Sequence, residues 1–216
     1  MIKLLFVLTC GLLVAGVNKP ALPDANEIMI SPLASYSPEW NKPVYQKCNT
    51  AASASYMSQP EKEMVWILNM ARLNPSLFLS TVVKKYPQQT DKPWLKNVDE
   101  YKSLLDTMGG LKALPILFPD SLCWASAECH AIESGKKGYV GHTRQSTSCN
   151  KLKRFYGECC DYSNGDPLDM LMNLLIDQGV PSLGHRYICL GYYYNKIGIS
   201  IQPHTAYGKN AVLDFY

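Results

Sequence analysis

The sequence predicts a layered α+β fold. With 216 residues, 47% of them hydrophobic and 18% charged, the chain is long enough for one sizeable core and has the composition of a globular protein. Segments with helical spacing of apolar residues come first, and segments with strand-like alternation follow at the C-terminus. Helices that precede strands in one domain favour separate layers over an alternating parallel sheet.

The first segment, residues 1–16, has the features of a secretory signal peptide. Lys3 precedes an apolar run, and the small residues Ala15 and Gly16 offer a cleavage site after Gly16. The run is too short for a spanning helix with polar flanks, so we expect a secreted, extracellular protein without a membrane span. Lipoprotein anchoring through Cys10, which follows the sequence VLT, is the alternative.

Residues 17–60 predict a linker or a loosely packed N-terminal extension. This segment is rich in proline, serine, alanine and asparagine and has little apolar periodicity. The folded domain is therefore expected to span residues 61–216.

Five helices are predicted within that domain. In the first, Met64, Ile67, Leu68 and Ala71 share one face. Proline at a first helical position, N-cap residues and glycine past the last turn mark the limits of the others. These helices are expected over 75–82, over 98–108 before Gly109-Gly110, from the cap Asp120 or Ser121 to about 137, and from the cap Asp166 to just before Gly179.

Two strands are predicted at the C-terminus. Ile197, Ile199 and Ile201 alternate along one face of the first strand, and residues 211–216 form the second. The polar segment between them predicts an antiparallel hairpin.

Charge and cysteine content limit the class of protein. The formal net charge of +3 and the absence of a Lys/Arg-rich run give no indication of nucleic-acid binding. Most cysteines beyond Cys10 should pair in an oxidising compartment, with connectivity left open and the adjacent Cys159 and Cys160 going to different partners. These cysteines are Cys48, Cys123, Cys129, Cys149, Cys159, Cys160 and Cys189.

Four polar residues near glycines are candidate metal ligands: His142, Glu158, Asp177 and His185. Two imidazoles with one or two carboxylates suit a divalent cation such as zinc, because a carboxylate either binds the cation or orients a ring through its other N–H. Their spacing matches no local metal motif, so the residues alone leave open that they are solvated or structural.

Other polar residues are expected to have structural roles. His130 lies among alanines and cysteines of a predicted helix and should be packed in the core, whereas His204 in the hairpin turn should be solvated. Residues 192–194, three tyrosines, are expected at a sheet edge or in the core. Arg186 is expected to form a salt bridge, either with Glu158 or with another carboxylate that has a purely structural role.

Six short motifs follow one another in the order of a known family. They are MVWILNMARLNP, LPILFPDSLCWASAECHA, GYVGHTR, YGEC, GVPSLGHRYI and KIGISIQ with YGKNAVLDF. In this order the chain resembles the CAP superfamily, the cysteine-rich secretory, antigen 5 and pathogenesis-related-1 group, and most closely its bacterial secreted SCP-like branch. The resemblance covers about residues 61–215 and implies a three-layer α-β-α sandwich with a central, mainly antiparallel sheet and a large cleft.

The resemblance also implies a site. In this family two histidines and two acidic residues line the cleft and bind a divalent cation, and His142, Glu158 and His185 match three of these positions. Asp177 is the candidate for the fourth, where relatives have a glutamate, and its shorter side chain suits orienting a ligand better than binding the cation. Cys159 replaces the usual asparagine after Glu158, and a disulfide there could fix the turn that carries Glu158.

Three function classes follow from these expectations. The first is a cleft protein that binds a divalent cation together with a lipid- or sterol-like molecule or an extracellular protein partner. The second is a disulfide-stabilised extracellular interaction domain with a vestigial cleft. The third is a metal-assisted hydrolase in which Glu158, His142 and His185 would be catalytic, although no G-x-S-x-G nucleophile motif is present.

Overall fold

A four-stranded mixed sheet lies at the centre of an α+β fold. The computed structural model describes residues 29–216, so the predicted signal peptide, the Cys10 alternative and the start of the predicted linker lie outside the described residues. The strand order is β1-β3-β4-β2, with β1 parallel to β3 and the other pairs antiparallel. The strands are β1 (Phe118–Pro119), β2 (Gly157–Tyr162), β3 (Lys196–His204) and β4 (Gly208–Phe215).

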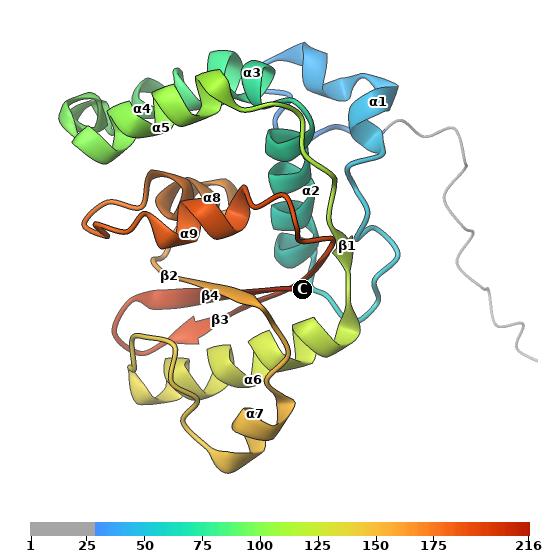
Figure 1. Ribbon diagram of the computed structural model, residues 1–216, viewed down its shortest axis with the longest axis vertical. Helices are drawn as coiled ribbons and strands as arrows, with labels where there is room; N and C mark the ends of the chain where they lie inside the picture. Colours follow the sequence, from blue (N-terminus) through green and yellow to red (C-terminus); the bar gives the residue numbers. More distant parts are fainter. Residues whose placement is uncertain (1–28) are drawn as a thin grey trace, which may run out of the picture.

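Helices cover both faces of this sheet, as the predicted three-layer arrangement requires (Figure 1). One face packs against α6 (Ser121–Lys137), and α7 (Thr147–Leu152) lies beyond it. The other face is covered by α2 (Gln59–Leu73), α8 (Pro167–Ile176) and α9 (Gly184–Cys189). Helix α5 (Asp99–Gly110) packs on the far side of α8. The shorter helices are α1 (Pro43–Gln46), α3 (Pro75–Phe78) and α4 (Tyr86–Gln89).

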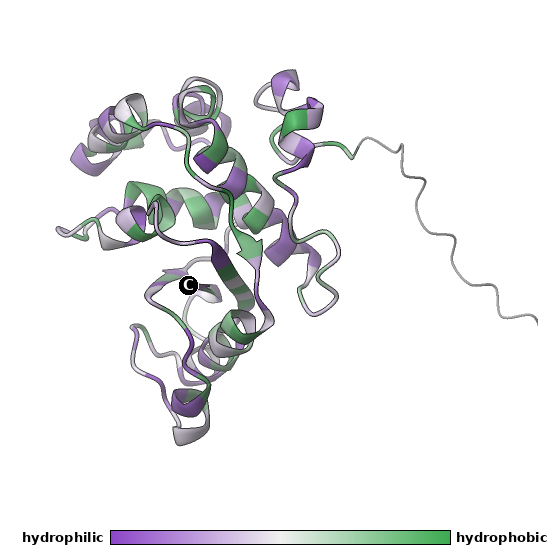
Figure 2. Cartoon of the chain, turned by 45° about the vertical axis from the view of Figure 1, so that its right-hand side comes forward, coloured by the Kyte–Doolittle hydropathy of each residue, from purple (hydrophilic) through white to green (hydrophobic). Residues whose placement is uncertain are grey.

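Helix α8 lies between β2 and α5 and buries residues on most of its circumference. A helix that is apolar all round is buried on several sides, and the hydrophobic colour predominates on α8 in Figure 2. Among residues 29–216, no helix combines the length and apolar character needed to cross a bilayer.

Helix α6 begins and ends where the sequence predicts. The Asp120 side chain accepts hydrogen bonds from two N–H groups of the first turn, and Gly138 ends the helix in the left-handed conformation with φ 63°. The helix also approaches β3 closely at Gly198, where an added Cβ would lie 2.0 Å from the backbone nitrogen of Trp124. Glycine at this position therefore sets the spacing between α6 and the sheet.

The prediction of a loosely packed segment before residue 61 is wrong for residues 29–60. Leu33, Trp40 and Cys48 are fully buried in the main core, and the indole N–H of Trp40 donates to Thr81 Oγ1 at 3.0 Å. This segment consists mainly of turns and single helical turns. Its buried residues therefore follow neither the 3.6-residue nor the 2-residue period by which a core face is recognised.

The hairpin of β3 and β4 confirms the two predicted strands, but two other elements differ from the prediction. Residues 157–162 form strand β2 rather than a turn, and residues 184–189 form helix α9, which is not among the five predicted helices. Five of the six residues of β2 are buried, because α8 and α9 cover one side of the strand and Cys160 packs with Ala127 and Ala131 of α6 on the other. A strand buried on both faces lacks the alternation that identifies a half-exposed strand.

Candidate functional site

The structure brings His142 and His185 together from elements far apart in the sequence. His142 lies on the loop between α6 and α7, and His185 lies in the first turn of α9. The ring centroids are 6.0 Å apart and the ring planes are inclined by 36°. Both rings line a cavity of about 360 Å³, as does Asp177 at the C-terminal end of α8. Glu158 on β2 lies behind His142 and is buried.

Glu158 orients the first ring. Its Oε1 lies 2.9 Å from Nδ1 of His142, and its Oε2 lies 2.6 Å from Nη1 of Arg144. Arg144 is itself buried and extends to Asp214, with its Nη2 lying 3.3 Å from Oδ2. Burial acts to raise the pKa of Glu158, but the His142 hydrogen bond and the Arg144 charge outweigh it and hold that pKa below its usual value. Glu158 is therefore the ionised carboxylate of this cluster.

Asp214 lies directly opposite Glu158 across the β2–β4 pairing. Burial, followed by the neighbouring Glu158 charge, raises the pKa of Asp214 well above its usual value. A single guanidinium thus lies between two carboxyl groups, of which Glu158 holds the negative charge.

Asp177 orients the second ring with both of its oxygens. Oδ1 lies 2.7 Å from Nδ1 of His185, and Oδ2 accepts the backbone N–H of the same residue at 2.9 Å. Asp177 ends α8 in the left-handed conformation, with φ 59°, which aspartate tolerates better than most residues.

The two carboxylates leave the same atom of each ring available. A neutral imidazole that donates from Nδ1 to a carboxylate carries its lone pair on Nε2, and metal-binding histidines are commonly held in this way. Zinc lies about 2.1 Å from an imidazole nitrogen, so two ligating rings at a tetrahedral angle have centroids about 5.2 Å apart. The observed 6.0 Å is close to that value, and the His142 side chain is 56% exposed, which allows a small approach.

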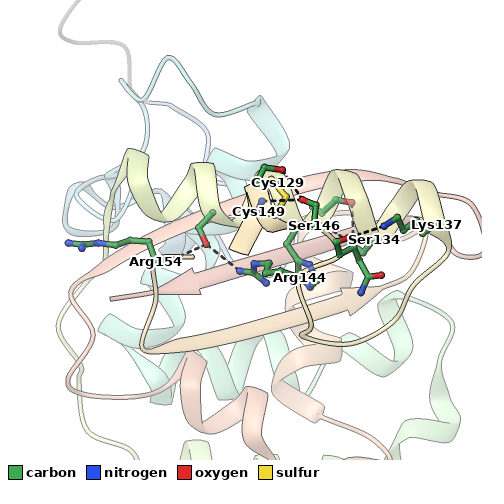
Figure 3. The surroundings of a disulfide bond; sticks show 12 residues. Cys129, Ser134, Lys137, Arg144, Ser146, Cys149 and Arg154 are labelled. Carbon is green, nitrogen blue, oxygen red and sulfur yellow. Dashed lines mark hydrogen bonds between the residues drawn. A yellow bond between two sulfur atoms is a disulfide. The ribbon is translucent and has the colours of Figure 1, made fainter. Parts of the chain in front are cut away.

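A disulfide fixes the segment that carries His142 and Arg144. Cys129 on α6 and Cys149 on α7 are joined, with a sequence separation of 20 residues (Figure 3). Arg144 donates to Ser126 Oγ on α6 at 3.2 Å. The disulfide and Arg144 therefore tie the same loop to α6, and Arg144 also ties it to the sheet.

The prediction that most cysteines pair is not met within residues 29–216. Besides the single disulfide, five cysteines are unpaired and buried. Cys159 Sγ lies 3.9 Å from Cys189 Sγ without a bond, so no disulfide fixes Glu158. Cys160, the next residue, packs on the opposite side of β2, against α6. The five are Cys48, Cys123, Cys159, Cys160 and Cys189.

Two groups of candidate metal ligands occur in the described part of the chain. The first, Cys129, Glu133 and Cys149, contains the two sulfurs of the disulfide, so no thiolate is available there. The second consists of His130, Glu158 and Cys160, three buried residues whose ligand atoms all lie within 4.8 Å of one another. Sequence reasoning placed His130 correctly in the core but missed its proximity to Cys160, since no local spacing connects α6 with β2.

Three other expectations can be compared with the structure. His204, expected in solvent, is buried at the end of β3, with Nε2 lying 3.1 Å from the carbonyl oxygen of Tyr139. Arg186 does not contact Glu158: its guanidinium donates to the carbonyls of residues 100, 175 and 176 and joins α9 to α8 and α5. Of the three tyrosines, Tyr194 packs against the core as expected, whereas Tyr192 and Tyr193 are exposed in the turn before β3.

Comparison with known proteins gives little further information. No protein-family model matches the chain, and no curated protein matches it. Among solved structures, an outer surface protein from Borrelia burgdorferi is similar with 19% sequence identity and a TM-score of 0.37. The alignment covers 60% of this chain and 92% of that chain. A similarity of this size establishes neither a common fold nor a common function.

Proposed function

We propose that this chain is an exported cleft protein of the CAP type that binds a divalent cation through Nε2 of His142 and Nε2 of His185. The observation that carries the proposal is the matched pair of contacts, in which Glu158 and Asp177 each face Nδ1 of one ring. The rings lie close together at one cavity, and both carboxylates are buried. Chance contacts between surface histidines would not supply each ring with its own buried carboxylate.

Zinc is the cation that this donor set suits best, because neutral imidazoles are among its commonest ligands. A cation held by two histidines keeps coordination positions for water or for a polar group of a second ligand. The surrounding cavity of about 360 Å³ is within the range of small-molecule sites. Val140, Leu174 and Val180 line it and favour a ligand with an apolar body and one electron-donating group, as in a lipid- or sterol-like molecule.

Export agrees with the chemistry of the cysteines. The disulfide between Cys129 and Cys149 is typical of an oxidising compartment. The five unpaired thiols are all buried, which slows their oxidation there. Residues 1–16 supply the export signal under this proposal.

Calorimetric titration with zinc tests the site. Wild type should bind zinc, and His142→Ala and His185→Ala should each weaken binding by more than about tenfold, because each removes one of two protein ligands. Tyr187→Ala is the matched control, since this residue lies two positions after His185 on α9 and is 64% exposed. Unchanged zinc affinity in both histidine variants would refute the site. If the variants lost zinc but kept an extracellular partner, the chain would be an interaction domain with a vestigial cleft.

A hydrolase is less well supported, because both carboxylates already serve to orient the histidine rings. Both oxygens of Glu158 contact His142 or Arg144, and both oxygens of Asp177 accept from His185. A base must reach the proton of its attacking water. Ester or peptide turnover that is abolished by a chelator and by Glu158→Gln would favour the hydrolase instead.

A further inference from the structure

We infer a second cation site, buried beneath the first, in which His130, Glu158 and Cys160 are the protein ligands. It goes beyond the proposed function, which uses the exposed nitrogens of His142 and His185. The three residues join α6 to β2, and their ligand atoms lie within 4.8 Å of one another. Imidazole nitrogen, carboxylate oxygen and thiolate sulfur together suit zinc and chemically similar divalent ions.

The strand geometry of β2 places two of the ligands on one face. Side chains at positions i and i+2 of a strand point to the same side, so Glu158 and Cys160 both face α6. Cys160 packs with Ala127 and Val212 on that side, whereas Cys159 belongs to the core on the other. The two adjacent cysteines are therefore inequivalent, and only Cys160 approaches His130.

His130 has a free nitrogen in a buried position. Its Nε2 lies 2.8 Å from the carbonyl oxygen of Gly141, so Nε2 carries the proton and Nδ1 carries the lone pair. Within the described residues, this Nδ1 has neither solvent contact nor a hydrogen-bond partner. A buried acceptor left without a partner is costly, so we assign Nδ1 as the nitrogen with which His130 would bind the cation. Metal-binding histidines often donate their other N–H to a backbone carbonyl in this way.

Charge balance also permits a divalent ion. Binding forms a sulfur–metal bond at Cys160 and releases the thiol proton to water, with no change in oxidation state. The cation then lies against two negative ligands, Cys160 thiolate and Glu158. Arg144 contacts both Glu158 and Asp214 beside these ligands.

The cavity described above gives access to this site. Cys160 lines it together with His142 and His185, and Cys160 Sγ lies 3.7 Å from Nδ1 of His142. The inner group is therefore reached past His142. A cation in the outer site contacts Nε2 of the same ring, whereas one in the inner site contacts sulfur.

Cobalt(II) distinguishes the two sites, because a thiolate ligand produces a sulfur-to-cobalt charge-transfer absorption that histidine and carboxylate ligands do not. We expect this band when the full chain, kept under anaerobic conditions without a thiol reductant, is titrated with Co²⁺. The band should disappear in Cys160→Ala and persist in the matched control Cys159→Ala. It should also persist in His185→Ala, which removes a ligand of the outer site alone.

Three results would overturn the inner site: cobalt bound without the band, the band retained in Cys160→Ala, or the band lost in Cys159→Ala. Cobalt bound without the band leaves the proposed function intact. The outer site alone would be overturned if His185→Ala kept the band and His142→Ala kept wild-type zinc affinity. X-ray absorption on zinc-loaded wild type needs no variant. A sulfur neighbour at about 2.3 Å supports the inner site, and nitrogen or oxygen neighbours alone refute it.

Discussion

Replacement of Asp177 by asparagine isolates the orienting role of this carboxylate from the ligands themselves. Both oxygens of Asp177 face donors of His185, the backbone N–H at 2.9 Å and ring Nδ1 at 2.7 Å. An amide has one acceptor and one NH₂ group, so Asp177→Asn can accept from only one of these donors. If the NH₂ group faces the ring, Nδ1 must become the acceptor and the proton moves to Nε2. The lone pair that would bind the cation is then lost.

The expected size follows from what such orienting contacts contribute. Loss of a carboxylate that holds a metal-binding histidine lowers metal affinity about 10- to 100-fold, which corresponds to about 1.4–2.7 kcal/mol. If the amide turns the other way, its NH₂ group opposes the backbone N–H at the start of α9. The variant then loses a hydrogen bond to a charged group, worth about 1.5–3 kcal/mol of folding stability.

Calorimetric zinc titration and thermal unfolding, measured on the same preparation, separate these outcomes. Asp91→Asn is the matched control, because it makes the same chemical change at another left-handed residue, with φ 54°, in an exposed position away from the site. We expect Asp91→Asn to keep wild-type affinity and melting temperature. An Asp177→Asn variant with both unchanged would refute the orienting role.

The remaining predictions concern stability and thiol chemistry. Gly198→Ala should destabilise the protein by about 1–3 kcal/mol through overpacking against α6. Gly110→Ala is the control, because no atom lies within 4 Å of the added carbon. Equal denaturant unfolding curves for the two variants would contradict the prediction. The double replacement Cys129→Ala/Cys149→Ala opens a loop of 20 residues and should lower the free energy of unfolding, measured with denaturant, by about 3 kcal/mol. A decrease of less than about 1 kcal/mol would be inconsistent with the entropy of closing that loop. Burial raises the pKa of Cys48 to about 12, so about one thiol in ten thousand is ionised at pH 8. Because Cys48 is also fully buried, an alkylating reagent should label it only after unfolding, and rapid labelling of the native protein at pH 8 would show that the site opens.

Local signals predicted the longer helices well. Asp120 and Asp166 each cap a helix through their own side chains, and a cap is a contact between near neighbours that a short stretch of sequence specifies. The alternation of Ile197, Ile199 and Ile201 likewise identified β3. In these elements propensity, pattern and capping agree.

Non-local burial accounts for what sequence reasoning missed. Strand β2 has no exposed face to give alternation. Trp40 is held by Phe78 of α3 and by Thr81 rather than by a periodicity of its own segment. The candidate site shows the same limit. The order of motifs pointed to His142 and His185, but nothing in the spacing could show that Cys160 faces His130 while Cys159 faces away.

The burial of Leu33 and Trp40 constrains how this chain can be trimmed. A protease that removes residues as far as Gly16 leaves every described contact in place, whereas one that cuts after Trp40 strips two large apolar side chains from the main core. Complete burial of such side chains contributes about 1.5–3 kcal/mol each, a large share of the roughly 5–15 kcal/mol by which domains are stable. Recombinant fragments that begin at residue 61 should therefore aggregate or be degraded.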